Sequence, residues 1–304
     1  MKKEMLELLE KEMNLKDKNA EELFQIGVKE IGESVKKLGL KDSNYMNRKE
    51  LQEMLDTEYI GQEMYLFEAV RSTNSVAKFL ADFGVSEGTV IVSETQTGGK
   101  GRSGKEWASP KGGIWLSIVL NPEISPAKAP LLTLATGVAV RKTLEKFGID
   151  SEIKWTNDIL INDKKVCGIL TESLAKQNQI EHVVIGIGIN ADLNIESLPE
   201  KFREGSVSLS EVVDDEINKL KGLTAFFKEF ELIYNKFKEE DFEYILKEWR
   251  KYSHTIGKHV KIYQAFGKVI AGYAVGIDYD GALILEKANG KLVKIISGEC
   301  RVQQ

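Results

Sequence analysis

The 304-residue chain is 42% hydrophobic and 29% charged, proportions that are ordinary for a globular protein of about two or three domains. Its formal net charge of -5 disfavours broad electrostatic binding to nucleic acid, and its two cysteines, Cys167 and Cys300, provide no disulfide framework. No apolar run reaches about 18 residues and the N-terminus lacks a signal-peptide core, so we expect a cytoplasmic protein without membrane contact.

Residues 1–58 are predicted to form a helical N-terminal segment. Leucine and methionine recur at helical spacing near the start, and Asn47 is placed to cap a later helix. A helix-turn-helix is one interpretation, but Glu30 and Glu33 would face DNA phosphates on its second helix. The pattern favours a helical extension that packs or dimerises, and it disfavours DNA binding without excluding it.

The following segment predicts strands and helices in a mixed order. Apolar and β-branched runs predict strands, and polar capping residues or prolines mark the helix starts. The expected elements are a strand at 64–67, a helix from 72–74 to about 83, strands at 89–94 and 114–120, and a helix after 130 to about 147.

A glycine-rich loop at 96–107 carries four glycines and three cations and ends on Trp107. Glycines let backbone N–H groups approach a ligand, and the cations would neutralise an anion there. The glycine spacing also fits two nucleotide-binding motifs, but both require a helix at Gly104, and Pro110 with Gly112-Gly113 forbids a long one. We therefore predict a strand, a long anion-binding loop and a strand. A flexible surface hairpin is the alternative, which the clustered cations disfavour.

A second informative region runs from 152 to 190. It predicts a strand, a turn at 155–158, and a hairpin whose turn is Asn162-Asp163. Strand glycines follow at Gly168, Gly186 and Gly188. Such glycines mark either close approach of a ligand or plain sheet packing, and the sequence leaves both readings open.

The last third of the chain changes character twice. Residues 199–208 read as loop, and 209–249 as mostly helical with a break at Gly222. From about 253, short strands at 260–263, 269–275, 282–285 and 292–296, separated by Gly and Asp turns, predict a small β-barrel. No Ser-His-Asp set, Cys-His pair or metal-ligand cluster is apparent, which favours chemistry by positioning and charge neutralisation, such as nucleotidyl transfer.

Five segments resemble, in order and spacing, the signature blocks of biotin protein ligases. They are 72–74, 96–107, 154–158, 165–170 and 186–190, and the C-terminal strands resemble the final domain of those enzymes. The resemblance covers about 59–304. It implies an α+β fold with a central mixed β-sheet and flanking helices, similar to class II aminoacyl-tRNA synthetases. The implied domains are a catalytic one at 59–252 and a small β-barrel at 253–304, after the N-terminal segment at 1–58.

The resemblance implies a two-step reaction. Biotin is activated by ATP with Mg²⁺ to biotinyl-5′-AMP, and a lysine of a biotin carboxyl carrier domain then takes the biotin. No tightly bound, protein-ligated metal is expected, and no metal ligands are assigned. The family also implies two features that the sequence does not decide, namely a homodimer and a degenerate winged helix in place of an unrelated module at 1–58.

By the family's pattern, Lys165 is the leading catalytic residue, assisted by Arg102 and Asp158. The implied biotin-binding residues are Ser72, Thr73, Asn74, Gln96, Gly99, Lys100, Gly101, Arg102, Trp107, Lys165 and Gly168. The implied ATP-binding residues are Arg102, Lys105, Trp107, Asn157, Asp158, Lys165 and Asn190.

The loop departs from the family at Lys100 and Lys105, where arginines are usual. Charge is kept but the bidentate guanidinium is lost, which predicts weaker retention of the adenylate. Three rival functions stay open: a lipoate or octanoate ligase, a biotin-responsive DNA-binding repressor with ligase activity, and a protein that only binds biotin. Gln96 and the glycine-rich loop favour biotin, because its fused-ring head group needs polar partners.

Overall fold

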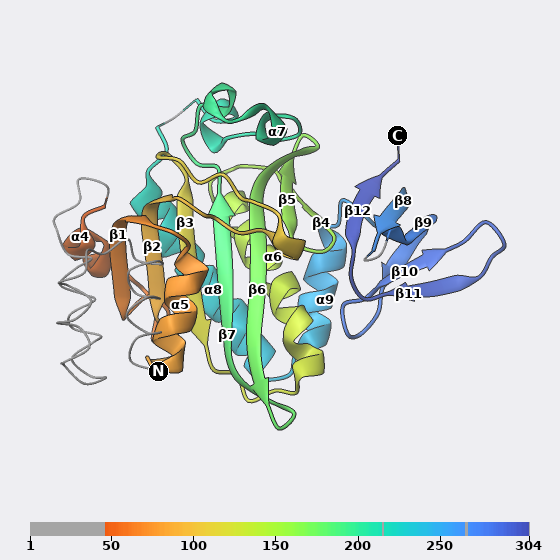
Figure 1. Ribbon diagram of the computed structural model, residues 1–304, viewed down its shortest axis with the longest axis horizontal. Coiled ribbons are helices and arrows are strands. Elements are labelled where there is room, and N and C mark those ends of the chain that lie inside the picture. The colour runs from red at the N-terminus through yellow and green to blue at the C-terminus, as the bar shows by residue number, and fades with distance from the viewer. Residues whose placement is uncertain (1–45, 215, 265–266, 304) are drawn as a thin grey trace.

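The computed structural model describes residues 46–214, 216–264 and 267–303, so the predictions for residues 1–45 lie outside the described residues. Two β-sheets organise the described residues (Figure 1). The larger has seven strands in the order β1-β2-β3-β7-β6-β5-β4, and the smaller has five in the order β11-β10-β9-β8-β12. The predicted α+β class with a central mixed sheet is confirmed.

The seven-stranded sheet is mixed because β1 and β2 pair in parallel while its other neighbours are antiparallel. The predicted hairpin turn is confirmed, since Asn162 and Asp163 both adopt positive φ angles of 50° and 62° between β5 and β6. The strands are β1 Met64–Val70, β2 Val90–Gln96, β3 Ile114–Leu120, β4 Glu152–Lys154, β5 Asp158–Ile161, β6 Lys164–Lys176 and β7 Gln179–Ile189.

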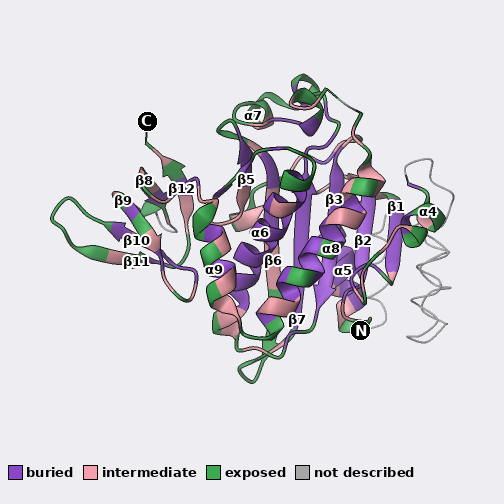
Figure 2. Ribbon diagram, turned by 180° about the vertical axis from the view of Figure 1, so that it is seen from behind, coloured by how far each residue is buried: buried purple, intermediate pink, exposed green. Residues whose placement is uncertain are grey.

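Helices cover the two faces of this sheet unequally. Three of them, α6 Ala129–Lys146, α8 Lys219–Lys238 and α9 Phe242–Lys251, lie on one face (Figure 2). On the other face lies α5, Thr73–Asp82, which leaves room beside it for the glycine-rich loop (Figure 1). Most of α6 is buried because it lies between the sheet and α8, so it needs no polar face.

Two short helices complete the described set. The helix α4, Arg48–Glu53, begins as predicted at Asn47, whose side chain accepts hydrogen bonds from the next amides. The predicted loop at 199–208 contains α7, Glu200–Arg203. The predicted break at Gly222 is wrong, because α8 continues through it. A side chain there would meet nothing within 4 Å, so this glycine imposes no turn.

The chain is fastened to α8 just before the first strand. The Glu231 carboxylate accepts hydrogen bonds from the backbone N–H groups of Glu58, Tyr59 and Ile60 at 2.7, 2.9 and 2.9 Å. Glu231 is buried, and three amide donors satisfy its charge there. This carboxylate fixes where the segment before 58 joins the large sheet.

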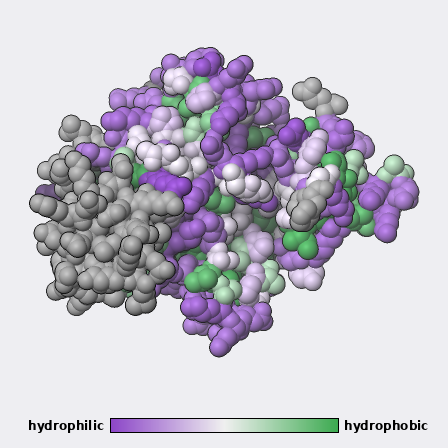
Figure 3. Space-filling model, in the orientation of Figure 1, coloured by the Kyte–Doolittle hydropathy of each residue, from purple (hydrophilic) through white to green (hydrophobic). Residues whose placement is uncertain are grey.

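The predicted C-terminal β-barrel is wrong, because β11 and β12 are the two edges of an open five-stranded sheet. Its strands are β8 His259–Tyr263, β9 Val269–Ile277, β10 Leu283–Glu286, β11 Leu292–Ile295 and β12 Glu299–Val302. Figure 3 shows hydrophobic residues at the surface of this sheet. The exposed side chains of the small sheet include Val269, Val275 and Leu292. Across the described residues, none of the helices combines the length and the apolar character that spanning a membrane requires.

Candidate active site

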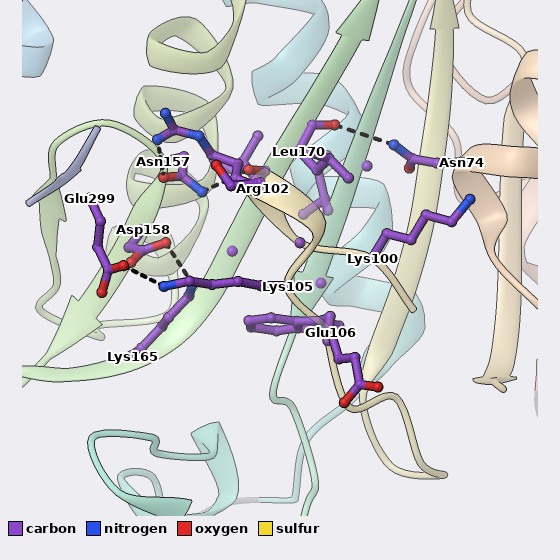
Figure 4. Close-up of a pocket in the computed structure, with 18 of the residues that line it drawn as sticks. Asn74, Lys100, Arg102, Lys105, Glu106, Asn157, Asp158, Lys165, Leu170 and Glu299 are labelled. Atoms are coloured by element: carbon purple, nitrogen blue, oxygen red, sulfur yellow. Dashed lines mark hydrogen bonds and ion pairs between the residues drawn. The ribbon is translucent and has the colours of Figure 1, made fainter. Parts of the chain in front are cut away.

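A cavity of about 610 Å³ opens on the α5 face of the large sheet. Its walls come from the start of α5, the glycine-rich loop, strands β5 to β7 and the β12 edge of the small sheet (Figure 4). Thirteen of the fifteen predicted site residues line it: Ser72, Thr73, Asn74, Gln96, Lys100, Gly101, Arg102, Lys105, Trp107, Asn157, Asp158, Lys165 and Gly168.

The other two predicted residues, Gly99 and Asn190, do not line the cavity. A side chain at Gly99 would collide with the carbonyl of Trp107 and lie 2.7 Å from Ser109 Oγ, so this glycine lets the loop pack on itself. The Asn190 amide donates to the carbonyls of Val207 and Lys165 at 3.1 and 3.4 Å. Both residues therefore hold the frame around the cavity.

The glycine-rich loop between β2 and β3 is a small internal hairpin. Gly101 N–H donates to the Lys105 carbonyl at 2.7 Å, and Trp107 N–H donates to the Gly99 carbonyl at 3.0 Å. Its tip is a single 3-10 turn, Arg102–Gly104, after which no α-helix begins. The helix N-terminus that a Walker or dinucleotide motif needs is therefore missing at this loop, as the sequence predicted.

Two strand glycines make space for side chains of the protein itself. A side chain at Gly188 would overlap the Trp107 indole nitrogen, and one at Gly186 would overlap Asn74 Oδ1. The sequence left open whether these glycines admit a ligand or only allow sheet packing. In the structure, side chains of the protein itself, Trp107 and Asn74, approach the backbone closely at Gly188 and Gly186. Lys165 Nζ lies over the Trp107 ring, 4.9 Å from its centre.

One end of the cavity is charged. Lys165 Nζ lies 2.6 Å from Asp158 Oδ1, and Lys105 pairs with Glu299 of β12 (Figure 4). The Lys105 ammonium lowers the pKa of Glu299, an effect that burial partly opposes. We refer to Lys105, Asp158, Lys165 and Glu299, together with Arg102, as the charged end.

Arg102 is held in place at the charged end by neutral partners. Its guanidinium donates to Thr156 Oγ1 and Asn157 Oδ1, both at 2.9 Å, and Asn157 in turn donates to the Ile169 carbonyl. Burial lowers the pKa of Arg102, while the Asp158 carboxylate acts in the opposite direction. Guanidinium donors that these two oxygens do not occupy are available for an anion.

The opposite end is lined by hydroxyl and amide groups, with the Lys100 ammonium close by, 3.1 Å from Ser75 Oγ. Gln96 Oε1 accepts from the Thr73 backbone N–H at 2.8 Å, and Gln96 Nε2 donates to Ser109 Oγ at 2.8 Å. Ser117 of β3 lies behind this wall, 2.8 Å from Thr73 Oγ1 and 2.6 Å from Asn74 Oδ1. We refer to Thr73, Asn74 and Gln96, with Ser72, as the neutral end.

Several residues of the site were not predicted. Ser117 supports the neutral end, and its signal was a hydroxyl inside an otherwise apolar strand. The small sheet contributes Tyr263, Gln264, Ser297, Gly298, Glu299 and Cys300, which only the tertiary arrangement brings to the cavity. Burial raises the pKa of the Cys300 thiol to about 11, so it stays protonated near neutral pH.

One cluster of metal-type ligand atoms occurs in the described residues, at Glu152, Asp163 and His254. It lies outside the cavity, and the 2.7 Å pair between Asp163 and His254 accounts for their proximity. In the cavity, Asp158 supplies a carboxylate oxygen of the kind that Mg²⁺ takes together with substrate phosphates.

The chain is similar to proteins of known activity in both of its sheets. The model of the "Biotin/lipoate A/B protein ligase family" matches residues 66–190, and that of the "Biotin protein ligase C terminal domain" matches 255–302. The "Bifunctional ligase/repressor BirA" of Bacillus subtilis is 35% identical, with 93% of this chain and 87% of that protein covered. The protein of the same name from Escherichia coli K12 is 32% identical over 80% of this chain and 74% of its own length.

Solved structures of biotin protein ligases agree with these sequence matches. A biotin protein ligase from Aquifex aeolicus, in complex with biotin and ATP, superposes with a TM-score of 0.69 at 28% identity, covering 80% of this chain and 99% of that chain. The same enzyme without ligand gives a TM-score of 0.66 at 27% identity, with the same coverage of the two chains. On the sequence matches and this shared fold, the chain belongs to the biotin protein ligase family.

Proposed function

We propose that this protein activates biotin with ATP to biotinyl-5′-AMP and then transfers the biotin to a lysine of a carrier domain. The observation that carries the proposal is one continuous cavity with a neutral, hydrogen-bonding end and a charged end. The neutral end suits an uncharged polar ring, and the charged end suits a carboxylate that meets a polyphosphate. The Aquifex aeolicus relative was solved with biotin and ATP, the two ligands that this division requires.

The first step needs charge neutralisation more than a base. The biotin carboxylate attacks the α-phosphorus of ATP, the bond to the leaving phosphate breaks, and pyrophosphate departs. Two unit charges about 4 Å apart repel by roughly 4 kcal/mol at an effective dielectric constant near 20. Lys165 and Arg102 supply fixed positive charge at the place where the anions meet, which removes that barrier.

Lys165 is the residue that we expect to bridge the carboxylate and the α-phosphate. Its ammonium is already held in the cavity by Asp158 at 2.6 Å, so little reorganisation is needed when anions arrive. Mg²⁺ bound with the ATP phosphates would neutralise further charge, with Asp158 as the protein carboxylate within reach. Lys105 and Asn157 would then bind the nucleotide.

The second step uses the product of the first. A neutral lysine amine of the carrier domain attacks the acyl carbon of the adenylate, the mixed anhydride breaks, and AMP leaves. The same cations stabilise the departing phosphate. We propose that the carrier lysine reaches the cavity between the glycine-rich loop and β12, the two segments that Lys105 and Glu299 join.

Pyrophosphate release tests the substrate assignment. The wild type is incubated with ATP and Mg²⁺ and, in parallel, with biotin, lipoate or octanoate, with Lys165→Ala as the control. Release with biotin alone, lost in the control, is expected. Release with lipoate or octanoate would keep the chemistry and overturn the substrate, and no release with any acid would indicate a protein that only binds biotin.

A second function, biotin-responsive DNA binding, is favoured by one observation. The match to the Bacillus subtilis "Bifunctional ligase/repressor BirA" covers 93% of this chain, so it extends into residues 1–45. A gel shift with the protein's own upstream DNA, with and without biotinyl-AMP, tests it. Specific, salt-sensitive binding at nanomolar concentration supports the repressor role, and binding that does not depend on sequence contradicts it.

Light scattering with the adenylate tests the predicted homodimer.

A further inference from the structure

A line of hydrogen bonds leads from the neutral end of the cavity to a carboxylate outside it. Thr73 Oγ1 lies 2.8 Å from Ser117 Oγ, which lies 2.6 Å from Asn74 Oδ1. Asn74 Nδ2 then donates to Glu172 Oε2 at 2.8 Å. Thr73 and Asn74 line the cavity, whereas Ser117 and Glu172 are not among its lining residues. The charged Glu172, which does not line the cavity, is therefore connected by hydrogen bonds to Thr73 and Asn74, which do.

The number of available protons fixes the direction of these bonds. A carboxylate only accepts, so Asn74 turns its NH₂ group to Glu172 and its carbonyl oxygen to Ser117. That oxygen also only accepts, so the single Ser117 hydroxyl proton points at Asn74. The 2.8 Å contact between Ser117 and Thr73 must then use the proton of Thr73. Thr73 Oγ1 is left with lone pairs alone for the cavity.

Gln96 offers the competing direction for the Thr73 proton, at 3.2 Å. Its Oε1 already accepts the Thr73 backbone N–H at 2.8 Å, and its Nε2 donates to Ser109, so the Gln96 amide is fixed independently. Ser117 Oγ also lies within donating distance of Thr73 Oγ1, but its single proton is used by the nearer Asn74 Oδ1. The Thr73 proton therefore goes to Ser117, at the shorter of its two distances. Gln96 therefore does not reverse the polarity.

Glu172 is held as an acceptor by its surroundings. Lys78 of α5 donates to Glu172 Oε1 at 2.8 Å. Burial raises the pKa of Glu172, but the hydrogen bonds from Lys78 and Asn74 outweigh it, and the net pKa is lowered. Gly186 on the neighbouring strand leaves room for Asn74, since a side chain there would overlap Asn74 Oδ1. The carboxylate and the amide are thus both fixed by packing that belongs to the fold.

We propose that Glu172 is a positioning residue that makes Thr73 an obligate hydrogen-bond acceptor, so that the neutral end selects acids whose head group carries an N–H donor. The inference rests on the proposed function. The cyclic urea of biotin supplies such N–H groups, whereas the dithiolane of lipoate and the alkyl end of octanoate do not. A site built to pair with a polar group discriminates strongly against analogues that lack it.

The first variant is Glu172→Gln, which keeps the shape but lets the side chain donate as well as accept. Asn74 is then free to turn either way, and Thr73 loses its fixed polarity. The Kd for biotin, titrated without ATP at pH 8, is expected to rise about tenfold, equivalent to about 1.4 kcal/mol. The KM for ATP and the kcat at saturating biotin are expected to stay within about twofold.

A double-mutant cycle separates polarity from general packing. In a Thr73→Val background no hydroxyl is left to orient, so adding Glu172→Gln should change the biotin Kd by less than about twofold. Ser117→Ala interrupts the same line and should behave as Glu172→Gln does in both backgrounds. It also carries the test should Glu172→Gln fail to fold. Additive effects in the cycle would overturn the proposal.

Lys78→Met is the matched control, because it removes the ammonium but leaves the carboxylate and its bond to Asn74. It should keep the biotin Kd within about threefold. A loss equal to that of Glu172→Gln would show that the ion pair merely anchors α5. An unchanged biotin Kd in Glu172→Gln would refute the polarity role while leaving wild-type biotin activity intact. Failure of the proposed function appears separately, as a wild type that does not use biotin.

Discussion

The two ends of the cavity achieve order by different means. At the neutral end, uncharged side chains are locked by directed hydrogen bonds, as between Gln96 and Thr73. At the charged end, opposite charges hold one another, as between Lys165 and Asp158. Hydrogen-bond direction discriminates between ligands, whereas paired charges are preorganised for anions and can exchange partners. Under the proposed function, the neutral end would therefore set substrate choice and the charged end would set the rate.

The largest expected effect separates rate from binding at Lys165. Lys165→Ala removes the ammonium from the place where carboxylate and phosphate meet, so kcat for pyrophosphate release should fall by about 10³-fold. The Kd for biotin without ATP should rise much less, by about three- to tenfold, because only the contact of Lys165 with the biotin carboxylate is lost and the neutral end is untouched. Rapid-quench assays and calorimetry give the two values. A comparable loss in both would break the division between the ends.

Gly188→Ala is expected to harm both ends at once. The added methyl would overlap the Trp107 indole, which lines the cavity and has Lys165 Nζ 4.9 Å from its ring centre. Displacing it should weaken biotin and ATP alike by about 10- to 100-fold, the cost typical of overpacking. Gly222→Ala is the matched control. It meets nothing within 4 Å, lies inside α8 and should raise the unfolding free energy by about 0.5–1 kcal/mol. If only biotin binding or only ATP binding became weaker, Trp107 would support that end of the cavity alone.

Lys105→Ala should have a smaller effect, confined to the charged end. Lys105 is largely exposed and paired with Glu299, so its removal should raise the KM for ATP by about three- to fivefold, less at high salt. Lys111→Ala, which removes an exposed lysine paired with the partly buried Glu94 away from the cavity, should leave that KM unchanged. Equal effects of the two variants would indicate a general surface potential.

The smallest expected effect concerns retention of the adenylate. Lys100 donates to Ser75 Oγ at 3.1 Å, close to the neutral end, where the family usually has arginine. Lys100→Arg restores a planar donor with more hydrogen bonds and should slow biotinyl-AMP dissociation by about two- to fivefold. Stopped-flow displacement measures the two off-rates. Equal values would show that the lysine costs nothing in retention.

Local chemistry was enough to predict most of the large sheet and the cavity wall. The hairpin turn at Asn162-Asp163 and the Asn47 cap depend on neighbouring residues, and both are confirmed. The strand β12 was missed because it has only four residues, Glu299–Val302. Their polar–apolar alternation is too short to stand out in the sequence, and their conformation depends on pairing with β8. Closure into a barrel also depends on non-local pairing, and that prediction was wrong.

The site was harder to predict wherever a residue acts on another residue. The ATP-binding role of Asn190 stays a prediction, and in the structure its amide donates to two backbone carbonyls. Gly222 looks like a helix break, yet packing of Phe226 and Phe230 carries α8 through it. Glu172 stands in a strand where an acidic residue reads as solvent-facing. Its partners Lys78 and Asn74 come from about a hundred residues away.

The carboxylate of Glu231 has a practical consequence for shortening the chain. Because it holds the amides of residues 58–60, a truncated protein that starts at Gly61 would leave a buried negative charge without donors. A truncation that starts at Met46 keeps all three amides and α4. Any shortened chain that is to keep the Glu231 carboxylate paired must therefore include residues 58–60, although that glutamate lies more than 170 residues further along the chain.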